Sequence, residues 1–250
     1  MMALIFDVDG TLAETERDGH RVAFNQAFAE AGFNWYWSEA FYGELLSISG
    51  GKERIRYFIN HYLSDDTPRK NLDQLIQQLH KRKNDYYRQL LQDGQIPLRP
   101  GVKRLITEAH EAEIPLAIAT TSSLENTIAL LETHLGTEAY FSAIAAGDVV
   151  PQKKPAPDIY YYVLEQLNLS PADTLVFEDS QAGLTAATQA NLKTVITVND
   201  YTADQDFTDA ILVLSNLGEP EQPFTIYSDQ GPVHETYFNL HLAQSLLYSD

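Results

Sequence analysis

Two aspartates separated by one residue follow the first apolar run of the chain. Asp7 and Asp9 lie in Asp7-Val8-Asp9-Gly10-Thr11, directly after the run Ala3-Leu4-Ile5-Phe6. Such a run is typical of a buried parallel strand, and ligands bind beyond the carboxyl ends of these strands. Two carboxylates this close repel each other unless a cation or a shared proton relieves them. The pair indicates an Mg²⁺ site, with helix capping or a turn as the structural alternative.

A second acidic pair occurs late in the sequence. Glu178 and Asp179 follow another apolar run, Leu175–Phe177. If both runs are strands of one parallel sheet, their carboxyl ends lie at the same edge. Asp179 would then join Asp7 and Asp9 as an oxygen ligand of the metal, and Glu178 would support these ligands.

Hydroxyl groups follow a third apolar run. Thr120, Thr121 and Ser122 come directly after Leu116–Ala119. Hydroxyls and backbone N–H groups at the end of a strand are good donors to phosphate oxygens, although serine and threonine also begin many helices. The segment indicates a phosphate-binding loop.

Two lysines precede a pair of prolines in the segment Gln152-Lys153-Lys154-Pro155-Ala156-Pro157. The prolines keep this backbone out of a helix, so that a lysine here can be fixed and aimed. We expect Lys154 to neutralise charge on a phosphoryl group and Lys153 to be a solvated loop residue.

The elements that must position these residues alternate along the chain. Further apolar runs occur at Thr194–Val198 and Ala210–Leu214, and helical spacing such as Val102, Leu105, Ile106 and Ala109 lies between runs. This alternation predicts an α/β fold with a parallel sheet covered by helices. The stretch from Arg17 to Gln92 has helical spacing and no such run. We therefore expect a discontinuous core, residues 1–16 and 94–250, and a helical insertion over residues 17–93.

Composition excludes several classes of function. The 250 residues carry 35 acidic and 17 basic side chains, a net charge of −18, which disfavours nucleic-acid and anionic membrane partners. The absence of cysteine excludes disulfides, thiolate metal sites and cysteine nucleophiles. No apolar stretch is long enough to span a bilayer, and because the first residues are not basic we expect no leader peptide. We expect a cytoplasmic monomer, or a protein of the plastid stroma if the chain is a mature organellar one.

The four segments, in this order, resemble the signature motifs of the haloacid dehalogenase superfamily. The resemblance covers nearly the whole chain and implies a Rossmann-like core with a small helical cap inserted after the first motif. It implies Mg²⁺ as cofactor, held by Asp7, the Asp9 carbonyl and Asp179. It further implies that Asp7 attacks phosphorus to form an aspartyl-phosphate, that Asp9 is the general acid and base, and that Thr120 and Lys154 hold the transferring group.

Finer features are similar to the CbbY-type group of this superfamily. They are the segment from Ala13 to Arg21, Phe24-Asn25, Ser49-Gly50-Gly51-Lys52-Glu53-Arg54-Ile55, and the tail that begins Leu217-Gly218-Glu219-Pro220. The resemblance implies a sugar-bisphosphate phosphatase associated with carbon fixation, with xylulose 1,5-bisphosphate as substrate.

A bisphosphate needs a second anion site, for which the insertion offers candidates. Gly50 and Gly51 let backbone amides approach oxygen closely, and Lys52 and Arg54 add positive charge. The structural alternative is a helix–helix turn at the glycines. We also expect substrate contacts from three residues near the start of the insertion, Glu16, His20 and Arg21, although a histidine at a helix start is often structural.

Other functions stay open at this point. A phosphosugar mutase of the β-phosphoglucomutase type shares the aspartyl-phosphate, and His20 near Arg21 could supply the base that a mutase needs. Phosphoglycolate phosphatase is a second enzyme with this fold. A non-catalytic binding protein is a third alternative, but such proteins usually lose a nucleophile or a metal ligand. Asp7, Asp9, Lys154 and Asp179 are all present here.

Overall fold

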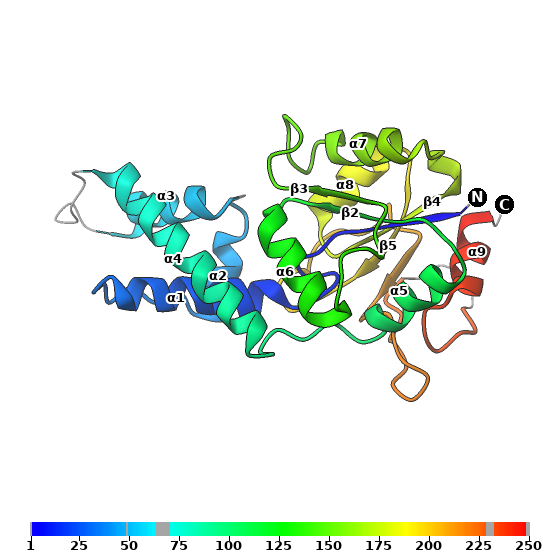
Figure 1. The fold of residues 1–250 in the computed structure, drawn as a ribbon, viewed down its shortest axis with the longest axis horizontal. Coiled ribbons are helices and arrows are strands. Elements are labelled where there is room, and N and C mark those ends of the chain that lie inside the picture. Colours follow the sequence, from blue (N-terminus) through cyan, green and yellow to red (C-terminus); the bar gives the residue numbers. More distant parts are fainter. Residues whose placement is uncertain (1, 49, 64–70, 229–232, 249–250) are drawn as a thin grey trace. The chain divides into compact units, whose positions relative to one another are not determined.

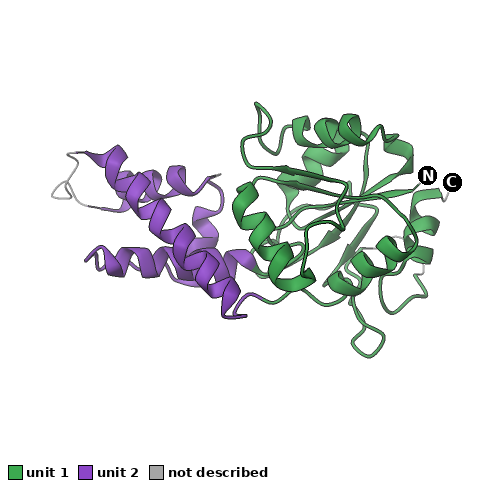
Figure 2. Cartoon of the chain, in the orientation of Figure 1, with its two compact units in different colours: residues 1–14, 97–250 green, residues 15–96 purple. Residues whose placement is uncertain are grey.

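The computed structural model describes residues 2–48, 50–63, 71–228 and 233–248, so Ser49 of the CbbY-like segment lies outside the described residues. The chain forms two compact units (Figure 2). Unit 1 consists of Met1–Glu14 and Pro97–Asp250, and unit 2 of Thr15–Ile96. These limits lie within a few residues of the division into core and insertion that the sequence predicts.

Unit 1 contains a six-stranded parallel sheet (Figure 1). Its strands are β1 (Ala3–Phe6), β2 (Leu116–Thr120), β3 (Ala143–Ala146), β4 (Thr174–Glu178), β5 (Lys193–Thr197) and β6 (Leu212–Leu214). Their order is β3-β2-β1-β4-β5-β6, so that β1 lies between β2 and β4. All ladders are parallel, with Phe6 opposite Ile118 on one side and opposite Phe177 on the other. This register brings the carboxyl ends of β1, β2 and β4 together.

Helices cover both faces of this sheet, which confirms the expected α/β fold. They are α5 (Val102–Glu111), α6 (Leu124–Leu135), α7 (Asp158–Leu167), α8 (Gln181–Gln189) and α9 (Leu240–Tyr248). Helices α7 and α8 pack on one face, where Ile5 and Val176 lie in a buried cluster with Tyr160 and Ala186. The other face contacts α5 and α9. There Phe6 stacks on Phe177 with ring centroids 4.6 Å apart, a contact that contributes about 0.5–1.5 kcal/mol beyond its buried area.

The alternation of side chains along β1 and β4 sets the direction of the residues that follow. Ile5 and Val176 point into the α7–α8 face, whereas Phe6 and Phe177 stack on each other. Because side chains alternate between faces, the positions after Phe6 and Phe177 return to the α7–α8 face. These positions are Asp7 and Glu178, and both are buried.

The regular secondary structure in the described residues of unit 2 is helical. A π-helical turn, Thr15–His20, leads into α1 (Arg21–Glu30), and α2 (Glu39–Leu45), α3 (Gly51–Tyr62) and α4 (Leu72–Gln92) follow. An aromatic cluster of Phe24, Phe28, Trp37 and Phe58 fills its interior. The side chain of Asn25 donates to the Trp37 carbonyl and accepts from the Trp37 N–H, which fixes the segment before α2.

Candidate active site

Three buried carboxylates meet at the carboxyl ends of two adjacent strands. Asp7 follows β1, Glu178 is the last residue of β4, and Asp179 comes next. Each offers an oxygen, and these oxygens lie within 4.8 Å of one another. Three oxygen donors in one buried cluster match the preference of Mg²⁺ for hard oxygen ligands. The residues present therefore fit the divalent cation that the sequence predicts.

The electrostatics of this cluster also favour a cation. Burial raises the pKa of Asp7 to about 8; Lys154 opposes this rise, whereas Glu178 and Asp9 add to it. Burial, together with the charges of Asp7 and Glu178, raises the pKa of Asp179 well above its usual value. The raised pKa values mean that the ionised carboxylates are disfavoured by burial and by their mutual repulsion, which a bound divalent cation would relieve.

Lys154 lies among these carboxylates, as the sequence predicts for a fixed lysine. Its ammonium donates to Asp7 Oδ1 at 2.7 Å, to Glu178 Oε1 at 2.5 Å and to the Ala119 carbonyl at 2.7 Å. Its side chain is only 6% exposed. Although burial alone would lower the pKa of Lys154, the charges of Asp7 and Glu178 raise it, so the ammonium stays protonated. Helix α7 begins at Asp158, after Pro157.

Tyr160 is a further member of the cluster, which the sequence analysis missed. Its hydroxyl donates to Glu178 Oε1 at 2.6 Å, and its ring lies 5.3 Å from the Lys154 ammonium. Tyr160 lies on the first turn of α7, and its position one turn before the buried Leu164 marks it only as a core residue. Glu178 is fully buried and accepts from both Lys154 and Tyr160. Its placement suits a residue that holds Lys154.

Asp9 and the segment after β2 are brought together at the same edge. The hydroxyl of Ser122 donates to Asp9 Oδ2. The backbone N–H of Ser122 donates to Thr120 Oγ1 at 3.1 Å, so Thr120 shapes the start of this loop. Thr120 is buried, whereas Asp9, Thr121 and Ser122 are half-buried. The predicted acid–base residue and the predicted phosphate-binding hydroxyls are therefore neighbours.

Within unit 2, the sequence-predicted residues Glu16 and Arg54 share Tyr42 as a partner. The Tyr42 hydroxyl donates to Glu16 Oε2 at 2.5 Å and accepts from Arg54 Nη1 at 2.7 Å. Arg54 is buried and also donates to the carbonyls of Leu45 and Ile48. Its guanidinium thereby ties α3 to the end of α2.

The remaining candidates of unit 2 occupy two places. His20 is buried, with Nδ1 2.9 Å from the ammonium of Lys83, whereas Arg21 donates to Glu39 on α2 at 3.2 Å. Gly50, Gly51 and Lys52 form the start of α3, and Lys52 is exposed. Gly50 has a φ of +92°, and a side chain at Gly51 would collide with the ring of His80. Glycine is therefore favoured at Gly50 by the backbone conformation and at Gly51 by the closeness of the His80 ring.

Comparison with known proteins places this geometry in a family. A family model for haloacid dehalogenase-like hydrolases matches residues 4–197, which include every residue of the site described above. The chain belongs to the haloacid dehalogenase-like hydrolase family. This membership confirms the superfamily resemblance that the four motifs carry.

The relatives of this haloacid dehalogenase-like hydrolase show to which group within the family it belongs. Protein CbbY of Cupriavidus necator is 45% identical over 225 residues, which cover 89% of this chain and 88% of the relative. The CBBY-like protein of Arabidopsis thaliana is 40% identical and covers 88% of this chain and 70% of the relative. The chain is therefore a CbbY-like hydrolase, and the expected phosphatase class is confirmed.

A solved structure supports the same placement. CbbY from Rhodobacter sphaeroides, a point mutant crystallised in complex with xylulose-(1,5)bisphosphate, is 43% identical with a TM-score of 0.79. The match covers 86% of this hydrolase and 95% of that chain. The TM-score supports a shared fold, and the sequence identity supports a close relationship.

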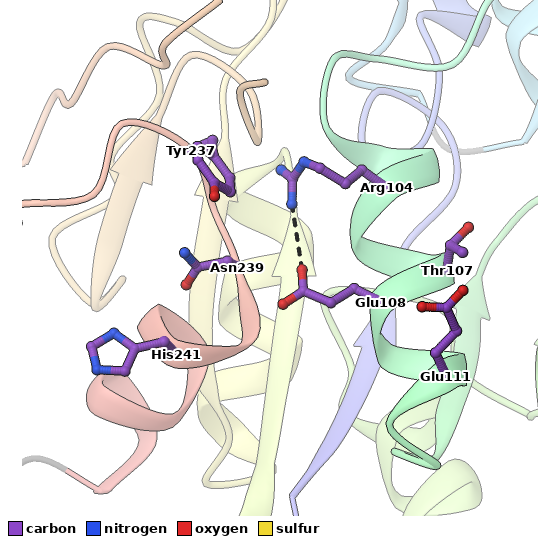
Figure 3. A pocket seen from close by; sticks show the side chains of 7 residues that line it. All are labelled: Arg104, Thr107, Glu108, Glu111, Tyr237, Asn239 and His241. Atoms are coloured by element: carbon purple, nitrogen blue, oxygen red, sulfur yellow. Dashed lines mark ion pairs between the residues drawn. The ribbon is translucent and has the colours of Figure 1, made fainter. Parts of the chain in front are cut away.

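A surface pocket of about 560 Å³ lies elsewhere on unit 1 of this hydrolase (Figure 3). Its lining comes from α5 and the segment before and at the start of α9: Arg104, Thr107, Glu108, Glu111, Tyr237, Asn239 and His241. Arg104 pairs with Glu108 at 3.5 Å, and its guanidinium lies 4.6 Å from the Tyr237 ring. The pocket contains none of the sequence-predicted site residues.

In the part of the chain that the structure describes, no helix has both the length and the apolar character to cross a bilayer.

Proposed function

We propose that this hydrolase is an Mg²⁺-dependent sugar-bisphosphate phosphatase that converts xylulose 1,5-bisphosphate to xylulose 5-phosphate and phosphate. The observation that carries the proposal is the contact of Lys154 with both Asp7 and Glu178 in the buried carboxylate cluster. The complex of the related CbbY with xylulose-(1,5)bisphosphate supports the choice of substrate.

In the proposed first step, a carboxylate oxygen of Asp7 attacks the phosphorus of one phosphate ester. A P–O bond to Asp7 forms, the P–O bond to the sugar breaks, and the sugar oxygen leaves with the electron pair. Asp9 gives its proton to that oxygen, which matters because an alkoxide is a poor leaving group near neutral pH. General acid help of this kind contributes about 10²–10⁴-fold.

In the second step, water attacks the phosphorus of the aspartyl-phosphate. Asp9, now a carboxylate, accepts a proton from this water, and the bond between phosphorus and Asp7 breaks to release phosphate. Ser122 donates to Asp9 and thereby holds its carboxylate at the end of β2. The segment Thr120–Ser122 and the ammonium of Lys154 compensate charge on the phosphoryl oxygens through both steps.

Asp7, Asp179 and the Asp9 carbonyl would hold the metal, with Glu178 beside them. When bound, Mg²⁺ would offset repulsion between the anionic nucleophile and the phosphoryl oxygens. The ammonium of Lys154, which donates to Asp7 and to Glu178, compensates part of the negative charge of these carboxylates.

We further propose that unit 2 is the helical cap that the sequence predicts and that it binds the second phosphate. Lys52 is exposed at the start of α3, beside Gly50 and Gly51, and the first N–H groups of a helix have no partner within the helix. Glu16, His20 and Arg21 are proposed to contact the sugar or that phosphate. Arg54 is proposed to act by holding α3 and α2 in place, because its guanidinium is buried and occupied within the unit.

The test is phosphate release from a panel of phosphate esters in the presence of Mg²⁺. The panel contains xylulose and ribulose 1,5-bisphosphates, phosphoglycolate and a small monophosphate ester, and Asp7→Asn serves as the inactive control. We expect the highest kcat/KM on xylulose 1,5-bisphosphate. Preferred hydrolysis of phosphoglycolate would overturn the substrate assignment. Conversion of a sugar monophosphate to its isomer, with catalytic bisphosphate present, would indicate a mutase.

A further inference from the structure

Asp179 has one side-chain amide donor, contributed by a loop that the four motifs do not include. Asn199 Nδ2 donates to Asp179 Oδ2 at 2.7 Å. Asn199 lies two residues after the end of β5, the strand next to β4. Asp179 is only 8% exposed, so water contributes little to the orientation of its carboxylate. The amide of Asn199 therefore determines which way this oxygen points.

The side chain of Asn199 is itself fixed in one orientation. Its Oδ1 accepts from the backbone N–H of Tyr201 at 2.9 Å, and its backbone N–H donates to Thr202 Oγ1 at 3.1 Å. A backbone N–H can only donate and a carboxylate can only accept, so the amide cannot flip without losing both bonds. The nitrogen of Asn199 must face Asp179.

The strand end that carries Asn199 is anchored by a buried arginine. Arg99 donates to the carbonyls of Thr197 at 2.9 Å and Val198 at 2.5 Å, the two residues before Asn199. It also donates to the carbonyl of Gly10, in the turn that follows Asp7. One guanidinium thus ties the turn after β1 to the end of β5 and limits their movement relative to each other.

Gly10 lies directly against the side chains of Asp179 and Asn199. It has a φ of +82°, and a Cβ at this position would overlap the Asp179 carboxylate and the Asn199 amide. The backbone of the turn after Asp7 therefore packs directly against the pair formed by Asp179 and Asn199. Asp7 and Asp179 follow neighbouring strands, and this packing adds a contact between the segments that carry them.

We propose that Asn199 is a positioning residue for Asp179, which it holds in the orientation that binds the divalent cation. The inference rests on the proposed function, because it takes Asp179 as a metal ligand. Hydrogen bonds to the ligands of a metal typically contribute 10–100-fold to metal affinity or activity. Asn199 would act before any substrate is present, through the metal site alone.

The test is calorimetric titration of the metal-free protein with MgCl₂, without substrate. Asn199→Ala removes the donor, and we expect the Kd for Mg²⁺ to rise about tenfold or more. Asn199→Ser provides a second variant, since a serine hydroxyl can accept from the Tyr201 N–H but is too short to reach Asp179. We expect Asn199→Ser to weaken Mg²⁺ binding to a similar extent.

Thr208→Ala is the matched control, because it removes the hydroxyl that donates to Asp206 in the same loop and leaves the contacts of Asn199 and Asp179. We expect its Kd for Mg²⁺ to stay within about twofold of the wild-type value. The Mg²⁺ concentration that gives half-maximal phosphate release should rise in Asn199→Ala, while kcat at saturating Mg²⁺ recovers towards the wild-type value. A general loss of structure would not be reversed by Mg²⁺.

Two results would overturn the inference. In the first, Asn199→Ala and Asn199→Ser bind Mg²⁺ with the wild-type Kd. In the second, Thr208→Ala weakens binding as much as they do, which would assign the effect to the loop. If the wild-type protein binds Mg²⁺ but releases no phosphate from sugar bisphosphates, the proposed function fails, and the titration still decides the role of Asn199.

Discussion

The ammonium of Lys154 lies 2.7 Å from Asp7 Oδ1 and 2.5 Å from Glu178 Oε1, so one cation joins the ends of two neighbouring strands. These three side chains are almost completely buried. Removing one partner of a buried ion pair leaves the others uncompensated, which costs about 3–5 kcal/mol in typical cases. Lys154 therefore stabilises the site and compensates charge during the proposed reaction.

Replacing Lys154 by methionine tests this dual role. Methionine keeps most of the side-chain volume but cannot donate to Asp7, Glu178 or a phosphoryl oxygen. We expect kcat to fall about 10²–10³-fold, as for the loss of one preorganised donor. Phosphate release at saturating substrate is the measurement. Lys153→Met is the control, because Lys153 pairs with the exposed Asp148, and its activity should stay within about twofold. Wild-type turnover by Lys154→Met would contradict the assignment.

Tyr160→Phe removes one of the hydrogen bonds to Glu178. The hydroxyl donates to a fully buried carboxylate, and hydrogen bonds to charged groups contribute about 1.5–3 kcal/mol. We expect a loss of stability of about that size and a several-fold loss of kcat, because Glu178 also holds Lys154. Urea unfolding and phosphate release are the measurements.

The adjacent tyrosine offers a matched control for this change. The hydroxyl of Tyr161 donates to the carbonyl of Gln189, and the side chain is 48% exposed. Tyr161→Phe should change stability by less than about 0.5 kcal/mol, as surface substitutions usually do. Equal losses in the two variants would show that the bond to Glu178 has no special weight.

Lys52→Ala tests the proposed second phosphate site of unit 2. Lys52 is exposed on α3, and loss of one charge-assisted contact to a phosphate should lower kcat/KM on a bisphosphate about tenfold. Turnover of a small monophosphate ester should stay within about twofold. Arg56→Ala removes an exposed charge of the same helix, one that pairs with Asp73, and should affect neither substrate. Equal losses of Lys52→Ala on both substrates would remove the case for this site.

The sheet and the position of its acidic residues could be predicted because apolar runs mark buried strands. The exception is β3, Ala143–Ala146, which the sequence analysis missed. This strand reads Ala-Ile-Ala-Ala, and alanine has a weak preference for strands. Its place beside β2 is set by packing under α7 rather than by its own sequence.

The contacts that orient the site could not be predicted, because they join residues far apart in the sequence. Asn199 reaches Asp179 across 20 residues, and Arg99 reaches Thr197 across 98. Neither residue belongs to a motif, and only the strand order brings them to the site. Their roles depend on tertiary contacts that local patterns do not contain.

The charges at the start of α3 show a different limit of sequence reasoning. Lys52 and Arg54 are both basic and lie close together in the sequence. The sequence analysis therefore predicts that both bind a phosphate. Residues at i and i+2 of a helix do not share a face. Accordingly, Lys52 is exposed, whereas Arg54 is buried and donates to carbonyl groups of its own unit. A direct contact of Arg54 with substrate stays a prediction.

His80 of α4 provides a pH-dependent prediction for unit 2. The pKa of His80 is lowered to about 4. Burial is the main cause, and the charges of Lys83, Lys52 and His20 contribute to the same decrease. The ordinary pKa of histidine is about 6.5, so between about pH 4 and 6.5 the unfolded chain binds a proton that folded His80 does not. Acidification across this window therefore favours unfolding, and the stabilisation is complete only above it.

We expect His80→Gln to reduce the loss of stability between pH 7 and pH 5. The full shift corresponds to about 3 kcal/mol; because the ring is partly exposed, we expect an effect of the order of 1 kcal/mol. Lys52→Ala should act in the same direction and to a smaller extent, because it removes one of the charges that oppose protonation. Urea unfolding followed by tryptophan fluorescence is suitable, since Trp35 and Trp37 both lie in unit 2. Identical pH dependence of His80→Gln and the wild-type protein would mean that His80 is not held neutral by its surroundings.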